Sequence, residues 1–272
     1  MSNIIKELGL KLVLECAYLF TNKKLIVFFY IDDIVILYYP LDINYYLKLR
    51  DTLIIKYYIT DLKDLKWFLG IRVLRDTSQN KIWLVQDSYI SKIAEQFHLE
   101  GTSAPTPMST EPLLKYEGVA DNHQKRVYQQ KVGSINYSAV STRPDAAYTS
   151  QRLLEHLLNP GPVHYKAADR VILYLNGTKD LALEYGGTTD TACTFESGTE
   201  NTNRSPEDPE SPLEFKGYSD ASFADDVNTR RSTQGIKFEL FKGTTDWKVT
   251  KQKGVTKSTT EAELGALSSV AD

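Results

Sequence analysis

The chain has 272 residues, of which 42% are hydrophobic, and a formal net charge of −3 at pH 7. This content suffices for one large domain or two modest ones, and the small net charge excludes a globally basic nucleic-acid-binding protein. Cys16 and Cys193 are too few for a disulfide framework or a thiolate zinc site, which predicts an intracellular, reducing environment.

The N-terminal stretch MSNIIKELGLKLVLE carries acids as well as bases and no small-residue cleavage site, so it does not read as a signal peptide. Residues 25–41 are apolar enough to suggest a membrane span. However, Asp32 and Asp33 would each cost roughly 2.5–3.5 kcal/mol at the centre of an inserted helix. The sequence therefore argues against a membrane protein.

The same segment is dense in Ile, Val, Phe and Tyr, which favour strands. LIVFFY and IVILYY predict a tight antiparallel hairpin with Ile31, Asp32 and Asp33 near its bend. One explanation of the adjacent Asp32 and Asp33 is that Asp is a common turn residue. The other explanation is a bound cation, because adjacent carboxylates repel each other and polar groups near a core need partners.

The next segments alternate between helix and strand patterns. Residues 42–59 predict an amphipathic helix with Asp42 as its N-cap. WFLGIRVLR and KIWLVQ predict two partner strands around the turn-like DTSQN, and SYISKIAEQFHL predicts a helix. TSAPTPMSTEP predicts a linker, because its prolines block regular structure.

Residues 124–176 are expected to be mainly helical, in three segments interrupted at RPD and at NPGP. Residues 186–214 change character, with many acids and many Thr, Ser, Pro and Gly. Such a composition predicts a disordered acidic linker, and the interdomain boundary is expected there.

The last segment predicts three strands and a helix. FKGYSDASFADD is expected to start as a strand and to end in a solvated loop containing Asp225 and Asp226. RRSTQGIKFELFKGTTDWKVTKQ predicts two further strands around a Gly-Thr turn. STTEAELGALSSVAD predicts a helix that Ser258 or one of the two threonines after it caps, with Glu261 strengthening the capping pattern.

The order of these blocks resembles one family. YIDD between two apolar strands resembles the active-site hairpin of reverse transcriptases. DLKDLKWFLGIRVLR, APTPM, GSINYSAVSTRPDAAY and NPGPVHYKAADRVILYLNGT resemble successive blocks of copia-type LTR retrotransposon polyproteins. GYSDASFADD, RRSTQG, DWKVTKQ and KSTTEAEL resemble the ribonuclease H region of that family. The collinear match spans nearly the whole chain, and departs at Lys63, where the family favours Gly, and at Asn176, where Lys is common.

The resemblance implies an α+β fold with four parts. Residues 1–85 would be a partial reverse-transcriptase palm with the YIDD hairpin, and residues 86–185 a mainly helical thumb and connection. Residues 186–212 would be the acidic disordered linker. Residues 213–272 would be a truncated ribonuclease H-like α/β domain with exposed edges.

The resemblance also implies two-metal phosphoryl transfer, with two Mg²⁺ (or Mn²⁺) ions in each complete site. Asp32 would be the direct ligand of the polymerase site and Asp33 the secondary one. In the ribonuclease H region, Asp220 would be the central ligand and Glu263 a ligand from the first helix. Glu263 is preferred to Glu261 because the family's catalytic Glu is followed directly by an apolar stretch.

The partners implied by the resemblance are an RNA template, a DNA primer, an RNA–DNA hybrid and the rest of the polyprotein, with no membrane. The implied location is intracellular, in a cytoplasmic virus-like particle or the nucleus. A locally basic tract could follow a phosphate backbone, although solvated strand faces explain it equally well. Its candidate nucleic-acid-binding residues are Arg230, Arg231, Lys251 and Lys253.

The expected function is that of a fragment of an RNA-directed DNA polymerase with a ribonuclease H region. The family carries another catalytic Asp upstream of YIDD and a further one after the Glu-bearing helix, and neither is found in these 272 residues. The isolated chain is therefore expected to be inactive. The alternative is a non-catalytic retroelement relic or a repurposed RNA–DNA hybrid-binding module.

Overall fold

The computed structural model of the protein describes residues 9–14, 16–187, 215–227 and 229–271. The chain divides into two compact units, Met1–Leu65 and Lys66–Asp272. Both units combine helices with sheets, as the predicted mixed fold class requires.

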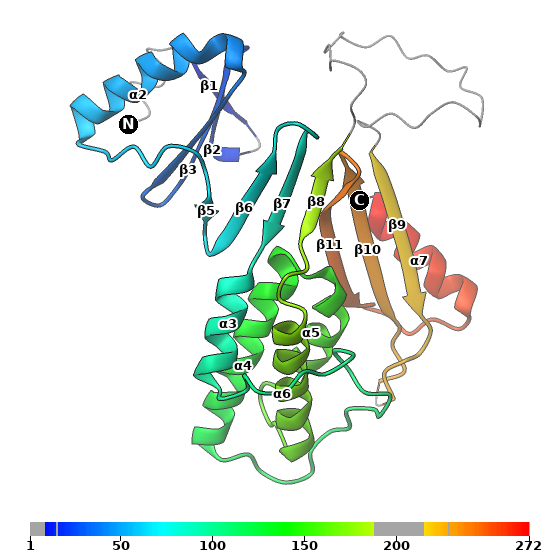
Figure 1. The fold of residues 1–272 in the computed structure, drawn as a ribbon. Helices are drawn as coiled ribbons and strands as arrows, with labels where there is room; N and C mark the ends of the chain where they lie inside the picture. The colour runs from blue at the N-terminus through cyan, green and yellow to red at the C-terminus, as the bar shows by residue number, and fades with distance from the viewer. Residues whose placement is uncertain (1–8, 15, 188–214, 228, 272) are drawn as a thin grey trace. The chain divides into compact units, whose positions relative to one another are not determined.

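The first unit is one antiparallel sheet followed by a helix (Figure 1). The strands lie in chain order, and they are β1 (Lys11–Val13), β2 (Cys16–Thr21), β3 (Leu25–Tyr30) and β4 (Asp33–Tyr38). A short 3-10 turn, η1 (Pro40–Asp42), leads into helix α2 (Ile43–Tyr57). Leu49 and Leu53 of α2 are buried with Leu25 and Val27 of β3, so the helix covers one face of the sheet. The predicted hairpin and helix are therefore confirmed, although the Asp42 side chain makes no capping hydrogen bond.

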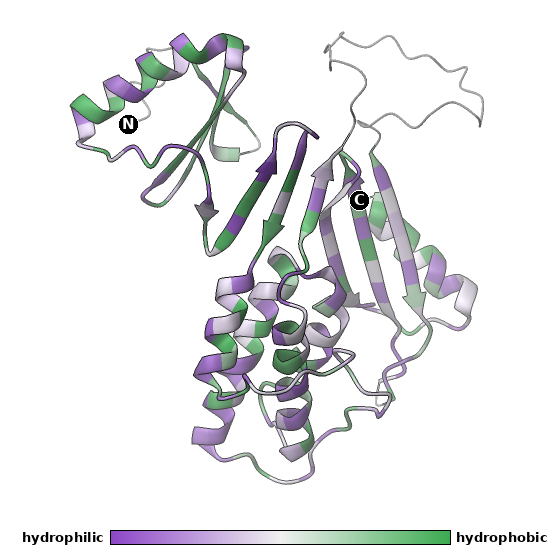
Figure 2. Cartoon of the chain, viewed as in Figure 1, coloured by the Kyte–Doolittle hydropathy of each residue, from purple (hydrophilic) through white to green (hydrophobic). Residues whose placement is uncertain are grey.

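The other face of this sheet is partly exposed among the described residues of the unit, although Val35 of β4, on the same face, is buried. Strand alternation places Ile26, Tyr30 and Leu37 opposite the α2-covered face, and all three are exposed. Figure 2 shows hydrophobic residues along these strands and an alternation of hydrophobic and hydrophilic residues along α2. Asp33 pairs with Tyr30 and therefore lies at the end of this apolar face.

The second unit begins with another antiparallel sheet. Its strands follow the order β5 (Trp67–Phe68), β6 (Ile71–Asp76), β7 (Lys81–Val85) and β8 (Leu183–Gly186). The prediction of one strand over WFLGIRVLR is wrong, because Leu69 and Gly70 form a tight turn with φ values of 51° and 73°. Two positive φ angles are typical of a hairpin turn that matches strand twist, and glycine adopts such angles without steric cost.

Between β7 and β8 lies a helical bundle, as predicted. Its elements are α3 (Asp87–Gln96), α4 (Asn122–Ser141), η2 (Pro144–Ala146), α5 (Ala147–Leu154) and α6 (Pro162–Gly177). Tyr128, Val132 and Ile135 of α4 are fully buried against Val171 and Ile172 of α6. Apolar residues at helical spacing thus form the core of the unit.

Residues 101–121 have no helix or strand, as the prolines predicted, but they are fastened to the bundle. Leu113 is buried in the helical core. The Asn159 side-chain amide donates to the carbonyl oxygens of Tyr116 and Gly118 at 3.1 and 2.8 Å. The segment is therefore a strap along the bundle rather than a free linker.

A buried arginine closes the bundle at η2. The Arg143 guanidinium donates to both carboxylate oxygens of Asp145, at 3.0 and 2.7 Å, and to the Thr178 carbonyl at 3.0 Å. The Tyr174 hydroxyl donates to the same carboxylate at 2.6 Å. Burial raises the pKa of Asp145, but these hydrogen bonds outweigh burial and leave that pKa lowered.

The last sheet has three antiparallel strands in the order β11–β10–β9, with helix α7 on one face (Figure 1). These elements are β9 (Lys216–Ser222), β10 (Thr233–Leu240), β11 (Gly243–Lys251) and α7 (Thr259–Ala271). The predicted Gly-Thr turn is wrong: Phe241 and Lys242 form it, with φ values of 55° and 61°, and Gly243 begins β11.

The start of α7 matches its predicted cap. The Glu261 amide donates to Ser258 Oγ at 3.1 Å, and the Glu261 carboxylate accepts from the Lys257 amide at 2.7 Å. Ser258 is therefore the capping residue among the three candidates, and Glu261 is engaged in the helix end.

The first compact unit ends at Leu65, because β5, β6 and β7 belong to a sheet that β8 completes. The domain boundaries placed at residues 85, 185 and 212 stay predictions. Residues 188–214, most of the predicted acidic linker, lie outside the described residues. The palm, thumb and ribonuclease H names for these parts stay predictions. No helix in the described part of the chain is long and apolar enough to cross a membrane.

Candidate carboxylate sites and nucleic-acid surface

The YIDD segment forms the tip of the β3–β4 hairpin. Tyr30 pairs with Asp33, so Ile31 and Asp32 alone make the turn. Ile31 has a φ of 52°, which a β-branched residue rarely adopts, and its side chain is 85% exposed. Similar positive φ values occur at the Leu69 and Phe241 hairpin turns, so this angle reflects the tight turn itself.

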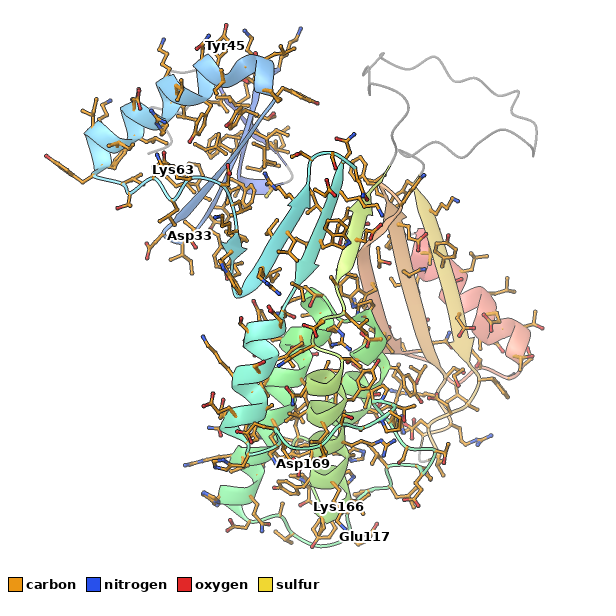
Figure 3. The ribbon with its side chains drawn as sticks, viewed as in Figure 1. Asp33, Tyr45, Lys63, Glu117, Lys166 and Asp169 are labelled. Atoms are coloured by element: carbon orange, nitrogen blue, oxygen red, sulfur yellow. The ribbon has the colours of Figure 1, made fainter. Side chains whose placement is uncertain are left out.

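Both carboxylates at this tip are exposed. Figure 3 shows Asp33 at the turn end of the hairpin, away from Tyr45 on α2. Within the described residues neither Asp32 nor Asp33 has a hydrogen-bond or ion-pair partner. Two adjacent carboxylates suit a hard divalent cation. Yet no group of three or more His, Cys, Asp or Glu residues in the described ranges could hold a metal, so the tip offers only part of a ligand shell.

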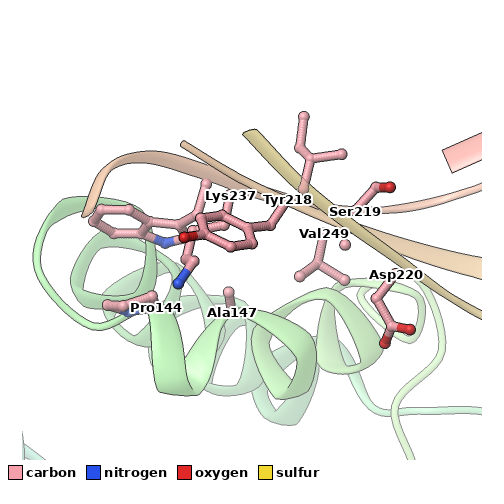
Figure 4. Close-up of a pocket in the computed structure, with 10 residues that line it drawn as sticks. Pro144, Ala147, Tyr218, Ser219, Asp220, Lys237 and Val249 are labelled. Atoms are coloured by element: carbon pink, nitrogen blue, oxygen red, sulfur yellow. The ribbon is translucent and has the colours of Figure 1, made fainter. Parts of the chain in front are cut away.

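Asp220 and Glu263 are not brought together. A side chain at Gly217 would point at Val270 of α7, its Cβ 2.7 Å from Val270 Cγ1. Asp220 lies three positions later on β9, so its side chain is on the opposite face of the sheet. There it lines a hollow with Pro144 and Ala147 (Figure 4). Glu263 lies exposed on α7. The sheet therefore stands between the Asp220 side chain and the helix that carries Glu263.

The expectation of a solvated loop at Asp225 and Asp226 is wrong. Asp226 is 4% exposed and accepts from Lys251 Nζ at 2.6 Å and from the Thr229 hydroxyl. Asp225 accepts from the Thr233 amide and hydroxyl, each at 2.8 Å. These bonds tie the β9–β10 loop to the strands on either side of it.

Lys251, a predicted phosphate contact, is occupied within the protein. Its ammonium lies between Glu155 of the bundle, at 2.8 Å, and Asp226 of the loop, at 2.6 Å. Burial lowers the pKa of Lys251, but the hydrogen bonds to the two carboxylates outweigh burial and raise that pKa above its ordinary value. The Lys251 ammonium therefore joins the last sheet to the bundle.

The other three predicted basic residues are exposed and share one end of the last sheet. The Gln252 amide donates to the Ser232 carbonyl at 2.8 Å, which holds the two loops next to each other. Arg230 and Arg231 precede this junction on one loop, and Lys253 follows it on the other. These three residues, named here the basic end, present exposed cationic groups of the kind that contact phosphates.

The sequence did not single out the hollow beside Asp220. In register across the sheet lie Tyr218, Lys237 and Trp247, and the next row contains Asp220, Gly235 and Val249. All six line a hollow of about 240 Å³. From strand alternation, the sequence could have predicted that the residues of each row share one face of the sheet. It could not have predicted which helix covers that face, because this depends on tertiary packing.

Comparisons with known proteins agree with the block order. The sequence model of the family described as "Reverse transcriptase (RNA-dependent DNA polymerase)" matches residues 2–110. The retrovirus-related Pol polyprotein from transposon TNT 1-94 of Nicotiana tabacum is 30% identical over 253 residues, which cover 89% of this chain and 17% of that polyprotein. The corresponding polyprotein from transposon RE2 of Arabidopsis thaliana is 32% identical over 216 residues, covering 78% of this chain and 13% of that polyprotein.

A smaller protein also matches. Secreted RxLR effector protein 161 of Plasmopara viticola is 37% identical over 141 residues, which cover 52% of this chain and 84% of that protein. No solved structure matches the chain. The chain spans less than one fifth of the two polyproteins, at 17% and 13% of their lengths.

Proposed function

The chain belongs to the reverse-transcriptase family of copia-type retrotransposon Pol polyproteins, and from this membership we propose that it is part of an RNA-directed DNA polymerase with a ribonuclease H region. The observation that carries the proposal is the exposed Asp32–Asp33 pair at the tip of the β3–β4 hairpin. An RNA template, a DNA primer and the remaining polyprotein would be its partners. Its location would be a virus-like particle or the nucleus.

The hairpin tip offers carboxylate oxygen atoms, which are ligands that suit the positive charge of divalent metal ions. Polymerisation joins the primer 3′ hydroxyl to the α-phosphate of an incoming nucleotide. Mg²⁺ or Mn²⁺, two ions in a complete site, would activate that hydroxyl and stabilise the leaving oxygen. Asp32 is proposed as the direct ligand and Asp33 as the secondary one. Their exposure lets both carboxylates meet a cation without breaking an existing bond among the described residues.

Two carboxylates leave most of the coordination shell of two ions unfilled, because Mg²⁺ demands octahedral oxygen coordination. The described residues offer no cluster of three such ligands. We therefore expect these 272 residues, expressed alone, to be inactive in primer extension. The longer polyprotein would supply the remaining ligands.

In the second unit, Asp220 and Glu263 are proposed as ligands of a ribonuclease H site that cleaves RNA in an RNA–DNA hybrid. Cleavage would need both carboxylates at the same ions. The opposite positions of the Asp220 side chain and α7 favour a second candidate, in which this part binds a hybrid without cleaving it. The basic end would then supply the phosphate contacts.

Primer extension tests the first candidate. A longer polyprotein segment that contains this chain should extend a DNA primer on an RNA template. Asp32→Asn should reduce the rate by about 100-fold or more, comparable to losing another group that stabilises transition-state charge. Asp64→Asn is the matched control, because it removes one exposed carboxylate elsewhere in the same unit. Equal rates for the two variants would contradict the role of Asp32.

The same assay on the 272 residues alone tests the expected inactivity. Extension by this chain, abolished by Asp32→Asn, would show that two carboxylates suffice and would overturn that part of the proposal.

Fluorescence anisotropy with a labelled RNA–DNA hybrid tests the second candidate. The apparent affinity should fall steeply as salt rises, because phosphate contacts release counterions. Lys253→Gln should weaken binding and flatten the salt dependence, whereas Lys92→Gln, at an exposed position of α3, should leave both unchanged. Absence of binding even at low salt would refute the hybrid-binding function.

A further inference from the structure

A hollow of about 240 Å³ lies between the last sheet and the start of α5 (Figure 4). It is on the sheet face opposite α7. Pro144 and Ala147 line it on the helical side, and Gly235 and Val249 line it on the strand side. Because Gly235 and Ala147 are small, the two walls leave room for a flat group between them.

Trp247 forms a fixed aromatic wall of this hollow. Its Nε1 donates to the Ala139 carbonyl at 2.7 Å, which holds the indole against the bundle. Tyr218 lies two strands away in the same cross-strand row. An aromatic ring that enters the hollow would therefore meet an indole whose position does not depend on the ligand.

The charges around the hollow are unequal. Lys237, between the two aromatic residues, pairs with Glu239 at 2.7 Å and lies over the Tyr218 ring, so its charge is compensated. Asp220, in the next row, has no hydrogen-bond or ion-pair partner within the described residues. The hollow thus combines apolar walls with one available carboxylate, a strong acceptor that can bind two N–H donors at once.

We propose that this hollow binds one planar heteroaromatic ring system that presents two adjacent N–H donors, as an unpaired guanine does. The carboxylate of Asp220 would accept both donors, and the ring would lie between Gly235 and Ala147. The volume is below the roughly 300–1,000 Å³ of drug-sized pockets, which suits one ring system rather than a duplex. This site goes beyond the proposed polymerase function, and it gives the Asp220 carboxylate a role other than that of the ribonuclease H ligand proposed above.

Base identity should matter at this carboxylate. Guanine offers a ring N–H and an exocyclic amine side by side, whereas hypoxanthine keeps only the ring N–H. Adenine turns a ring nitrogen lone pair toward the carboxylate, which repels it. Readout of an unpaired base by aromatic contacts and hydrogen bonds to its edge follows this pattern in RNA recognition.

Tryptophan fluorescence tests the proposal in the full chain. Trp67→Phe and Trp83→Phe leave Trp247 as the sole indole, since the chain has three tryptophans. Guanosine 5′-monophosphate should give a saturable change, the inosine nucleotide should bind about tenfold more weakly, and the adenosine nucleotide should give no change. Ribose 5-phosphate controls for binding through the phosphate and should also be silent.

Two variants distinguish the site from a general effect. Asp220→Asn should weaken binding of the guanosine nucleotide at least tenfold, and it leaves the fold intact because Asp220 is exposed. Gly235→Leu should abolish binding by filling the hollow. Gly254→Leu is its matched control, because a Cβ at either glycine meets nothing within 4 Å. Thermal melts by circular dichroism verify that each variant is folded.

Three results would overturn the proposal: no saturable change with the guanosine nucleotide, an equal response to the adenosine nucleotide, or unchanged affinity in folded Asp220→Asn. None of these readouts involves polymerisation or hybrid cleavage, so the failure of this site and the failure of the proposed function are distinguishable.

Discussion

The chain contains two Asp-Asp pairs close to strands, and the structure treats them in opposite ways. Asp32 and Asp33 lie at a hairpin tip, exposed and without partners among the described residues. Asp225 and Asp226 follow β9, and Asp226 is 4% exposed with Lys251 beside its carboxylate. The same dipeptide is an exposed pair of carboxylates in one place and a structural tie in the other.

This difference shows that the role of a carboxylate depends on whether hydrogen-bond donors from distant parts of the chain reach it. Lys251 is 25 positions from Asp226, and Glu155 reaches the same ammonium from the end of α5. Burial of Asp226 is tolerated because its charge is paired and hydrogen-bonded. The hairpin tip receives no such donor from the described residues, so its carboxylates stay in water, where a cation can reach them.

Lys251→Met should give the largest effect on this comparison. It leaves Asp226 buried without its cation, so the free energy of unfolding should fall by about 3–5 kcal/mol. Urea denaturation followed by tryptophan fluorescence measures this, because Trp67, Trp83 and Trp247 all belong to the second unit. Lys248→Met, at an exposed position of the same strand, is the control, and an equal loss in both variants would contradict the tie.

Asp226→Asn should cost less, about 1.5–3 kcal/mol, because Lys251 keeps Glu155 as a partner while a charged hydrogen bond is lost. The same denaturation experiment measures it. A fall in the free energy of unfolding of less than about 0.5 kcal/mol, the usual range for exposed positions, would mean that the Asp226–Lys251 pair does not stabilise the fold.

Acid should weaken the second unit through His156. Burial, with neighbouring His164 as a second cause, lowers the pKa of His156 from 6.5 to about 4. The unfolded chain therefore binds a proton more readily, and the contribution to stability is complete above about pH 6.5 and lost as pH falls toward 4. Because the ring is only partly buried, we expect a loss of about 1–2 kcal/mol.

Denaturation at several pH values tests this slope. His156→Phe should flatten the difference between pH 6.5 and pH 4, and His123→Gln, at an exposed position, should leave it unchanged. Parallel pH profiles for the wild type and His156→Phe would exclude His156 as the source.

Asp33→Asn should have the smallest effect on stability, within about 0.5 kcal/mol, because an exposed side chain without partners loses nothing on neutralisation. Far-UV circular dichroism melts of the whole chain measure this, because the first unit contains none of the tryptophans and fluorescence does not report on it. A loss as large as that of Asp226→Asn would erase the contrast between the two pairs.

Local patterns predicted the elements well where one signal dominated. The β3–β4 hairpin, helix α2 and the Ser258 cap follow from strand-forming residues, helical periodicity and a capping motif. The predicted turn positions were wrong where the same residues were compatible with either a strand or a turn. Leu69–Gly70 interrupted an expected strand, and Phe241–Lys242 formed the turn in place of the glycine that follows.

The candidate sites were less predictable because they depend on packing between distant segments. Asp32 and Asp33 are found at the bend that the sequence indicated. The face on which Asp220 lies depends on which side of the sheet α7 covers, and no local pattern specifies that. Nor did the basic tract reveal that Lys251 would be enclosed by Glu155 and Asp226.

The late pairing of β8 has a consequence for biosynthesis. Trp83 of β7 and Glu184 of β8 share a hydrogen bond although they are 101 positions apart. At roughly 5–20 residues per second, a ribosome leaves the edge of β7 without this partner for about 5–20 s. An unpaired strand edge invites pairing with another chain, and on polysomes neighbouring copies lie close by. The edge of β7 therefore stays exposed to such pairing until β8 emerges and completes the sheet.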